Sequence, residues 1–437
     1  MSSFEIDFSW EAPGRAKGPE LRATWAQFKL VADNTSITQV VDYRAKTIRE
    51  SIYLPLYPLA EWIATHWWWL LYEMQSPGRP QDDLYVSRHN FAYAREGYAL
   101  PDLNILPIGG SVILDWRASD LREQRVRFVT SGRVVVELRA FEAELVRLVE
   151  ATLERLEQEG VTETFLHGEW QAIRNVDRDE RDFCRAAAQL GLEGFDISAE
   201  DAQALLEAAG SLPAEMGDEF FSVATPAKLS AQVAAIRDTI AHISAAEVEL
   251  PAIVALKAAV SPLDPRAAPW KTGYELANHV RDRLKLNGTL ISTLGQLREV
   301  LGIAAEAWDA AQRPFRDDCT FIDALVAVNK AKSPGFLIEK RREDSRMFAF
   351  CRALCEYLVL DAGASGLISE TRSQRQQLNR AFAAEFLAPA ESLRRKISGR
   401  TISEESVDEI AAEYGTSPFV IRHQLENHGI AEIVSEA

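Results

Sequence analysis

The sequence predicts an α+β protein in which strands come first and helices follow. Between Phe4 and Trp10, large apolar residues alternate with polar ones, which is the period-two pattern of a half-buried strand. From Glu137 to Glu159, apolar residues recur instead at helical spacing, and helical patterns dominate most of the chain after that point. A strand-like stretch returns at Phe321 to Val328. Strands and helices segregated in this way are typical of the α+β class.

The composition indicates a globular protein with an acidic balance. The chain has 437 residues, with 48 Lys and Arg against 65 Asp and Glu, which gives a net charge of −17. At about 150 residues per domain, this length suggests two or three domains. The acidic balance argues against broad binding of a phosphate backbone, which requires a basic surface. Nucleic acid is therefore not an expected partner, although a local basic patch stays open.

We expect a cytoplasmic protein with no membrane partner. The four cysteines are too few and too scattered for the disulfide framework of a secreted protein. The first ten residues lack the basic and apolar regions of a signal peptide. The most apolar stretch, Ile52 to Tyr72, contains Glu61, His66 and two prolines, so it is not expected to span a membrane.

Three regions are expected along the chain. Residues 1–138 form a β-rich domain of unknown role, residues 139–262 a helical middle region, and residues 263–437 a C-terminal domain. Within the middle region, Gly210 to Lys228 contains two prolines and two glycines and is expected to be a linker. Three prolines between Ser261 and Pro269 mark the last boundary.

Two features of the first region can be tested directly against a structure. Residues 126–129 are expected to lead through a Thr-Ser-Gly turn into residues 134–136 as a β-hairpin. A helix is expected from about Leu59 to Glu73, and it carries Trp62 and the triplet Trp67–Trp69. We interpret this tryptophan cluster as the packing face of a helix on the sheet. An exposed patch that binds a partner is the alternative.

The C-terminal region shows a regular succession of elements. A helix is expected at Gly273 to Leu286 and a strand at Phe321 to Val328. Ser333-Pro334-Gly335 then turns the chain into a second strand. A long helix follows at Asp344 to Leu360, and another at about Arg372 to Leu387.

Four phrases in this region resemble the ImmA/IrrE family of bacterial zinc metallopeptidases and occur in the family's order. They are GYELANHVRDRLKL (273–286), SPGFLIEKRREDSRMFAFCRALCEYLVL (333–360), NRAFAAEFLAP (379–389) and IAAEYGTSPFVIRHQL (410–425). The resemblance covers under half of the chain. It implies a mainly helical, zincin-like domain with a small sheet. It also implies a place among regulators of stress response, mobile elements or phages, whose active members cleave repressor proteins.

The sequence departs from the family at the residues that carry the chemistry. In the family, a His-Glu-x-x-His motif on the long helix provides two zinc ligands and the general base. The two histidine positions correspond here to Arg352 and Glu356, and the base position to Ala353. The third ligand of the family is an acidic residue four positions before the Asn of the Asn-x-Phe-Ala-Ala-Glu phrase. That Asn is Asn379 here, which puts Arg375 at the ligand position.

These replacements predict a site without a metal, a cofactor or a catalytic residue. Zinc needs about three neutral or anionic protein ligands, whereas Arg stays protonated and has no lone pair to donate. Our hypothesis is that Arg352 and Arg375 replace the charge of the metal. Glu356 lies one turn after Arg352 and is expected to pair with it at i, i+4. Glu385, which matches the Glu of the family phrase, is expected to add a second carboxylate.

Cysteines and histidines give weaker signals. Cys351 and Cys355 lie at i, i+4, but apolar neighbours place them on a packing stripe, so we expect buried thiols and no metal or redox site. None of the seven histidines has a partner at His-x-x-x-His spacing. A site assembled from histidines distant in sequence stays open.

The end of the chain has the spacing of a helix-turn-helix unit. Ala411, Gly415 and Ile421 occupy the positions for a small residue, a turn and an anchor. The second helix offers only Arg422 and His423 as basic residues, within a segment rich in acids. We therefore expect a structural pair of helices rather than a DNA reader.

The sequence as a whole predicts a non-catalytic, peptidase-like protein that acts as a regulatory, sensing or assembly partner of another protein. A stress, mobile-element or phage-defence module is the setting that the resemblance implies. An active metallo-endopeptidase with atypical ligands, cleaving a repressor or another protein, is the first alternative. Nucleic-acid binding through the N-terminal domain is the second. The sequence gives no oligomeric state.

Overall fold

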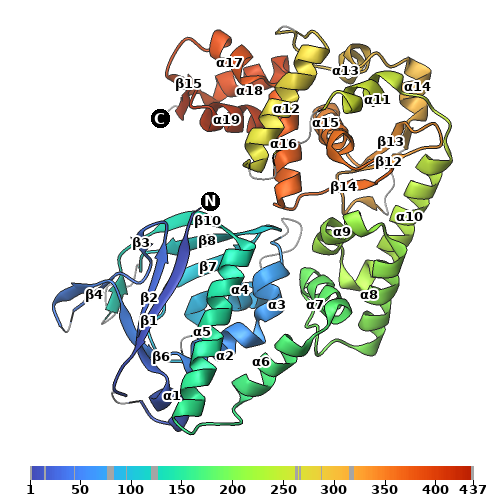
Figure 1. Ribbon diagram of the computed structural model, residues 1–437. Helices are drawn as coiled ribbons and strands as arrows, with labels where there is room; N and C mark the ends of the chain where they lie inside the picture. Colours follow the sequence, from blue (N-terminus) through green and yellow to red (C-terminus); the bar gives the residue numbers. More distant parts are fainter. Residues whose placement is uncertain are drawn as a thin grey trace. The chain divides into compact units, whose positions relative to one another are not determined.

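A computed structural model describes residues 2–13, 16–43, 45–75, 83–94, 96–119, 126–260, 264, 267–286, 288–313 and 319–434. The chain divides into two compact units, Met1–Ala199 and Glu200–Ala437. The first contains antiparallel sheets covered by helices, and the second is mainly helical around one small sheet (Figure 1). The α+β class predicted from the sequence is confirmed.

Strands of the first unit pair antiparallel in separate sheets. One sheet has the order β1-β2-β3, with β6 also paired to β2, a second has the order β10-β8-β7, and a third the order β5-β4-β9. Their bounds are β1 Phe4–Trp10, β2 Trp25–Ala32, β3 Thr35–Ser36, β4 Val40–Asp42, β5 Thr47–Arg49, β6 Ile52–Pro55, β7 Asp102–Pro107, β8 Ser111–Arg117, β9 Val126–Phe128 and β10 Gly132–Glu137. The predicted strand at the start of the chain, β1, pairs with β2 along its whole length, from Phe4 opposite Ala32 to Trp10 opposite Ala26.

Helices cover these sheets with their apolar faces. They are α1 Pro19–Ala23, α2 Tyr57–Thr65, α3 Trp67–Tyr72, α4 Asp83–His89, α5 Leu138–Gln158, α6 Phe165–Asn175 and α7 Arg178–Gln189. Phe141, Leu145 and Leu148 of α5 are fully buried, and α5 packs on β1, β8 and β10. Trp62, Trp67 and Trp68 are also buried, so the tryptophan cluster is a packing face, as predicted, although two helices share it instead of one.

The predicted hairpin at residues 126–136 is wrong. β9 pairs with β4, and β10 pairs with β8, so the two strands belong to different sheets. The residues between them cross from one sheet to the other instead of forming a tight turn. Thr130 Oγ1 donates to the Ser36 carbonyl, and Ser131 Oγ accepts from the Ala118 amide. These side-chain bonds tie the crossing residues to the backbone of two other segments, at Ser36 and Ala118.

The second unit surrounds a sheet with the order β11-β13-β12-β14, in which β11 runs parallel to β13 and the other pairs are antiparallel. The strands are β11 Gln312–Arg313, β12 Ala324–Val328, β13 Pro334–Ile338, β14 Gly366–Ile368, and a separate parallel pair of β15 Thr401–Ser403 with β16 Glu432–Val434. The helices are α8 Ala199–Ser211, α9 Gly217–Val223, α10 Leu229–Ala245, α11 Pro251–Ala258, α12 Pro269–Arg283, α13 Leu294–Val300, α14 Ala305–Ala310, α15 Glu343–Val359, α16 Gln374–Leu387, α17 Ala390–Lys396, α18 Glu404–Glu413 and α19 Pro418–Asn427.

The expected helical middle region, 139–262, is shared between the two units. Helices α5 to α7 pack in the first unit because their apolar residues, such as Phe141 and Trp170, join its core. Helices α9 to α11 belong to the second. The expected linker at 210–228 contains the 3₁₀ turns Ala214–Met216 and Pro226–Lys228 on either side of α9, with Phe220 and Phe221 buried. Most of the boundary expected within 261–269 lies outside the described residues.

None of the helices in the described ranges is long and apolar enough to cross a bilayer.

Candidate functional site

The two helices that carry the predicted site residues lie against each other in the second unit. α15 packs against β12, β13 and β14 of the sheet and against α16. As a result, α15 is buried almost along its whole length, including the charged residues Arg352 and Glu356. A charge in such a position is stable only with polar partners close by. The identity of those partners therefore decides what the site can do.

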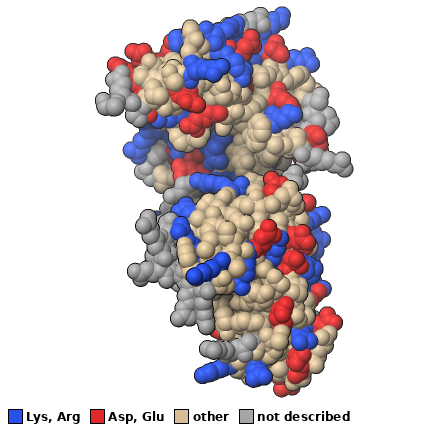
Figure 2. Space-filling view, turned by 90° about the vertical axis from the view of Figure 1, so that its left-hand side faces the viewer, with Lys and Arg blue, Asp and Glu red and all other residues tan. Residues whose placement is uncertain are grey.

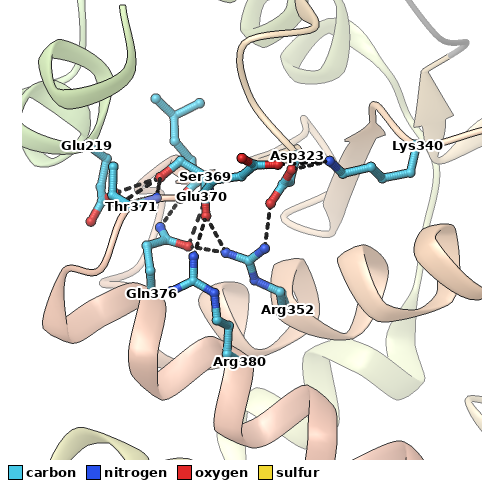
Figure 3. Close-up of polar contacts among 10 residues, drawn as sticks. Glu219, Asp323, Lys340, Arg352, Ser369, Glu370, Thr371, Gln376 and Arg380 are labelled. Carbon is cyan, nitrogen blue, oxygen red and sulfur yellow. Dashed lines mark hydrogen bonds and ion pairs between the residues drawn. The ribbon is translucent and has the colours of Figure 1, made fainter. Parts of the chain in front are cut away.

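Acceptors from other elements bind both terminal nitrogens of Arg352. It is 4% exposed, and its Nη1 donates to Asp323 Oδ2 at 2.5 Å. Its Nη2 donates to the Ser369 carbonyl at 2.5 Å and to Gln376 Oε1 at 2.7 Å (Figure 3). The expected pair with Glu356 one turn along the helix is not formed. That expectation was wrong because the guanidinium binds other acceptors instead. They are Asp323, which lies just before β12, and the Ser369 carbonyl, which follows β14.

Asp323 joins a second cation to this cluster. Its Oδ1 lies 2.5 Å from Lys340 Nζ, on the other side from Arg352. Burial on its own raises the pKa of the Asp323 carboxyl, but Arg352 and Lys340 outweigh that effect and hold the pKa below its usual value. The carboxylate is therefore charged and shared between two cations.

Glu356 pairs across the helix interface with Arg375 of α16. Arg375 Nε lies 2.6 Å from Glu356 Oε1, and Asn379 Nδ2 donates to Oε2 at 2.8 Å. Burial raises the pKa of the Glu356 carboxyl, and the Arg375 charge opposes the rise. The carboxylate also packs on Gly366 of β14, where a Cβ atom would lie 2.4 Å from Oε1. Glu356 and Arg375 thus form an ion pair, to which Asn379 adds a hydrogen bond.

The residues at these positions do not fit a zinc ion. Arg352 and Arg375 are cationic and offer no lone pair, Ala353 has no donor, and both oxygens of Glu356 already have protein partners. Throughout the described ranges, no group of three or more His, Cys, Asp or Glu side chains is placed to hold a metal ion. All seven histidines lie within those ranges.

Glu385 does not join the cluster, and the expectation of a second carboxylate there was wrong. Both of its oxygens accept from the Ala390 amide at 3.3 Å, and Gln424 Nε2 donates to Oε2 at 2.8 Å. His428 Nε2 lies 3.5 Å from the same oxygen. Glu385 therefore fixes the start of α17 and holds α19 in place. It lies six residues beyond Asn379 on α16, about 1.7 turns, so its side chain points about 120° away from that of Asn379.

Cys351 and Cys355 are fully buried in the apolar core of the second unit, as predicted. Burial raises the pKa of both thiols well above the usual range. Both thiols are free. They are packing residues of α15.

The pair of helices predicted at the end of the chain is present. Ala411 and Ile421 are buried between α18 and α19, and Gly415 turns the chain with a φ of 59°. A Cβ at Gly415 would lie 2.1 Å from the Ser292 carbonyl oxygen, so this position requires glycine. Arg422 is held by Glu404. On the face drawn in Figure 2, basic and acidic side chains are interspersed.

Several important residues gave no signal in the sequence. Asp323 and Gln376 bind Arg352 from 29 and 24 residues away, and Glu219 of α9 reaches Ser369 across 150 residues. Arg380 donates from α16 to the same Ser369 carbonyl as Arg352. Only the alternating hydroxyls in Ser369-Glu370-Thr371-Arg372-Ser373 form a visible pattern, and alternation alone does not identify their partner.

Comparisons of this chain with family models, with curated proteins and with solved structures gave no match. Its function has to be inferred from the residues themselves.

Proposed function

We propose that the C-terminal part of this chain is a degenerate domain of the ImmA/IrrE type, without peptidase activity, that acts as a regulatory, sensing or assembly partner of another protein. The order of elements supports this proposal. A long helix carries the degenerate motif, follows a two-strand hairpin, and packs on a second helix that carries Arg375 and Asn379. A cytoplasmic setting belongs to the same proposal.

One observation carries the proposal: each charged residue at a former ligand position is neutralised by protein. Arg352 lies in a cage of Asp323, the Ser369 carbonyl and Gln376. Arg375 neutralises Glu356. A divalent cation brought among these two guanidinium groups would be repelled and would find too few ligands. Fixed positive charge thus has the structural role that a metal has in an active relative.

The chemistry of hydrolysis has no support at these positions. A metallopeptidase depends on its ion to lower the pKa of bound water from about 15.7 to about 7, and on a neighbouring carboxylate as general base. Ala353 occupies the base position and cannot accept a proton. The polar residues of the cluster are bound to one another, which favours a rigid framework over a reacting centre.

The test is a peptidase assay on the purified full chain, with and without added zinc and with a chelator. Casein and a library of peptides serve as substrates. The proposal expects no cleavage above a no-enzyme blank in any condition. A variant that restores the motif and the acidic ligand, R352H/A353E/E356H/R375E, is the positive control for zinc uptake. Cleavage by the wild-type chain that the chelator abolishes would instead support the active peptidase with atypical ligands.

A further inference from the structure

Packing of the tryptophan cluster leaves a pocket in the first unit. Four helices, α3, α5, α6 and α7 (Figure 1), contribute residues to it, and its volume is about 60 Å³. Protein interiors leave few voids larger than one water molecule, whereas this space would hold about four. We call it the tryptophan pocket. The cluster therefore packs the fold and also lines a space that is large enough for part of a ligand.

The wall of the tryptophan pocket is apolar and held in place by packing. It consists of Trp67, Trp68, Tyr72, Val146, Trp170 and Ile173. Trp67 and Trp170 meet edge to face, with ring centroids 5.0 Å apart and ring planes at 87°. Each of the three indoles is at most 6% exposed, so its neighbours fix its position. A ligand that enters the pocket therefore meets a preformed apolar surface.

The volume of the pocket limits the apolar part of a ligand. In another protein, an apolar cavity of about 150 Å³ binds benzene. The tryptophan pocket has less than half that volume, so it is too small to enclose a six-membered ring. A short branched chain of about four carbon atoms is of the right size. The geometry thus favours a small aliphatic group over an aromatic one.

Charges of both signs line the pocket beside the apolar wall. Glu142 comes from α5, Arg174 from α6 and Arg181 from α7. Both arginines are exposed and Glu142 is partly buried, so the charged side is where the pocket meets solvent. Arg174 Nε lies 3.7 Å from Glu150 Oε1, a long contact between two exposed groups that contributes little. Both arginines are therefore accessible to an anion.

Glu142 and Arg181 influence each other without forming a direct ion pair. Burial raises the pKa of the Glu142 carboxyl, and the charges of Arg181 and Arg139 oppose the rise. Within the described ranges, neither Glu142 nor Arg181 has a side-chain hydrogen bond or a contact ion pair. A ligand that carries both an ammonium group and a carboxylate would pair with each of them at once. A ligand with a single charge would leave one of them without a partner.

We propose that the tryptophan pocket binds a free aliphatic α-amino acid, whose branched side chain lies against the indoles while its ammonium group pairs with Glu142 and its carboxylate with Arg174 and Arg181. The N-terminus of a peptide fits less well, because it has no carboxylate next to its first side chain. The inference goes beyond the proposed function and does not rest on it, since the pocket belongs to the first unit and the degenerate ligand cluster to the second.

The experiment is isothermal titration calorimetry of the full chain with L-leucine and with probes that each lack one of its groups. 4-Methylpentanoate lacks the ammonium group, L-leucinamide the carboxylate, and glycine the branched side chain. A hydrogen bond to a charged group is worth about tenfold or more in affinity. L-Leucine should therefore bind at least about tenfold more tightly than any of the probes. Equally tight binding of L-leucinamide would indicate a peptide N-terminus or a simple amine and would overturn the inference.

Variants connect each group of the ligand to its partner. E142Q should weaken L-leucine by about tenfold and leave 4-methylpentanoate unchanged, because that probe has no ammonium group. R181Q should weaken both of these ligands and leave L-leucinamide unchanged. E157Q makes the same chemical change as E142Q at an exposed position of α5 outside the pocket, and it should alter no affinity.

A last variant, V146F, fills the pocket and should abolish binding of every ligand. Near-ultraviolet circular dichroism shows whether it is folded, and E142Q with E157Q decides the matter if it is not. No binding of L-leucine at millimolar concentration, or an affinity that E142Q leaves unchanged, would overturn the inference. Neither result bears on the proposed function, which fails only if the wild-type chain cleaves protein.

Discussion

Glu356 forms its ion pair with Arg375 on the neighbouring helix, Nε to Oε1 at 2.6 Å, and not with Arg352 one turn away on its own helix. Arg352 instead pairs with Asp323. Each buried charge therefore has a partner on a different element, and the two pairs connect α15 to α16 and to the sheet. The cluster acts as a set of cross-links between elements.

Replacing Arg375 should destabilise the second unit in a pH-dependent way. R375Q leaves Glu356 buried without its cation, which should cost about 3 kcal/mol at pH 7. Burial already raises the pKa of Glu356, and loss of Arg375 raises it further. Because the folded pKa lies above the unfolded value, ionisation opposes folding, and the penalty shrinks as pH falls below the folded pKa and is gone below the unfolded one. Urea denaturation should show the gap to wild type shrinking as the pH is lowered from neutral. A gap independent of pH would contradict this, and E356Q/R375Q should lack the pH dependence.

Replacing Arg352 should be more damaging, because three acceptors lose their donor. In R352M, Asp323, the Ser369 carbonyl and Gln376 stay buried. We expect a loss of about 3–5 kcal/mol in the free energy of unfolding, measured by urea denaturation. The pKa of Asp323 is held low in the wild type. That stabilisation is present above the unfolded pKa and is lost as pH falls through the folded one. R352M should therefore lose less stability than wild type on acidification, and an unchanged acid profile would count against this assignment.

Gly366 should tolerate no side chain while Glu356 is present. A Cβ there would lie 2.4 Å from Glu356 Oε1 and 2.5 Å from its Cγ. G366A should destabilise by about 1–3 kcal/mol through overpacking. In a double-mutant cycle, E356A should recover at least part of that loss. Gly210 is a matched control, because a Cβ there meets nothing within 4 Å. G210A should be neutral or slightly stabilising, and an equal loss in both variants would refute the packing argument.

The cysteines should be unreactive in the folded protein. All four are buried, and burial raises the pKa of Cys184 to about 12. The thiolate is the reacting species, so both access and ionisation oppose modification. Ellman's reagent should detect no thiol in native buffer and four in urea. A rapidly reacting thiol in native buffer would contradict this prediction and would support a redox site at Cys351 and Cys355.

Local patterns in the sequence predicted the fold class and the main helices. Periodicity placed a helix at 344–360, close to the observed α15, and identified the buried stripe that contains Cys351 and Cys355. Periodicity failed at the predicted hairpin, because a strand–turn–strand pattern does not show which neighbouring strand each of its two strands pairs with. β9 and β10 are adjacent in sequence but pair with β4 and β8.

The sequence predicted part of the candidate site but not the partners that its charged residues bind. The resemblance brought Arg352, Glu356, Arg375 and Asn379 together, and they do lie on two packed helices. The i, i+4 rule then suggested the wrong partner for Arg352. That rule describes exposed helix surfaces, whereas a buried guanidinium is directed by the strongest acceptors around it. Asp323 is such an acceptor, and nothing in its local sequence identifies it.

The zinc content of the purified full chain tests the central claim most directly. The protein would be expressed with zinc in the medium, dialysed against metal-free buffer and measured by elemental analysis, with R352H/A353E/E356H/R375E alongside it. The account predicts no zinc above the buffer blank in the wild-type chain. One zinc per chain in the wild type, located by anomalous scattering among Arg352, Glu356 and Arg375, would contradict it.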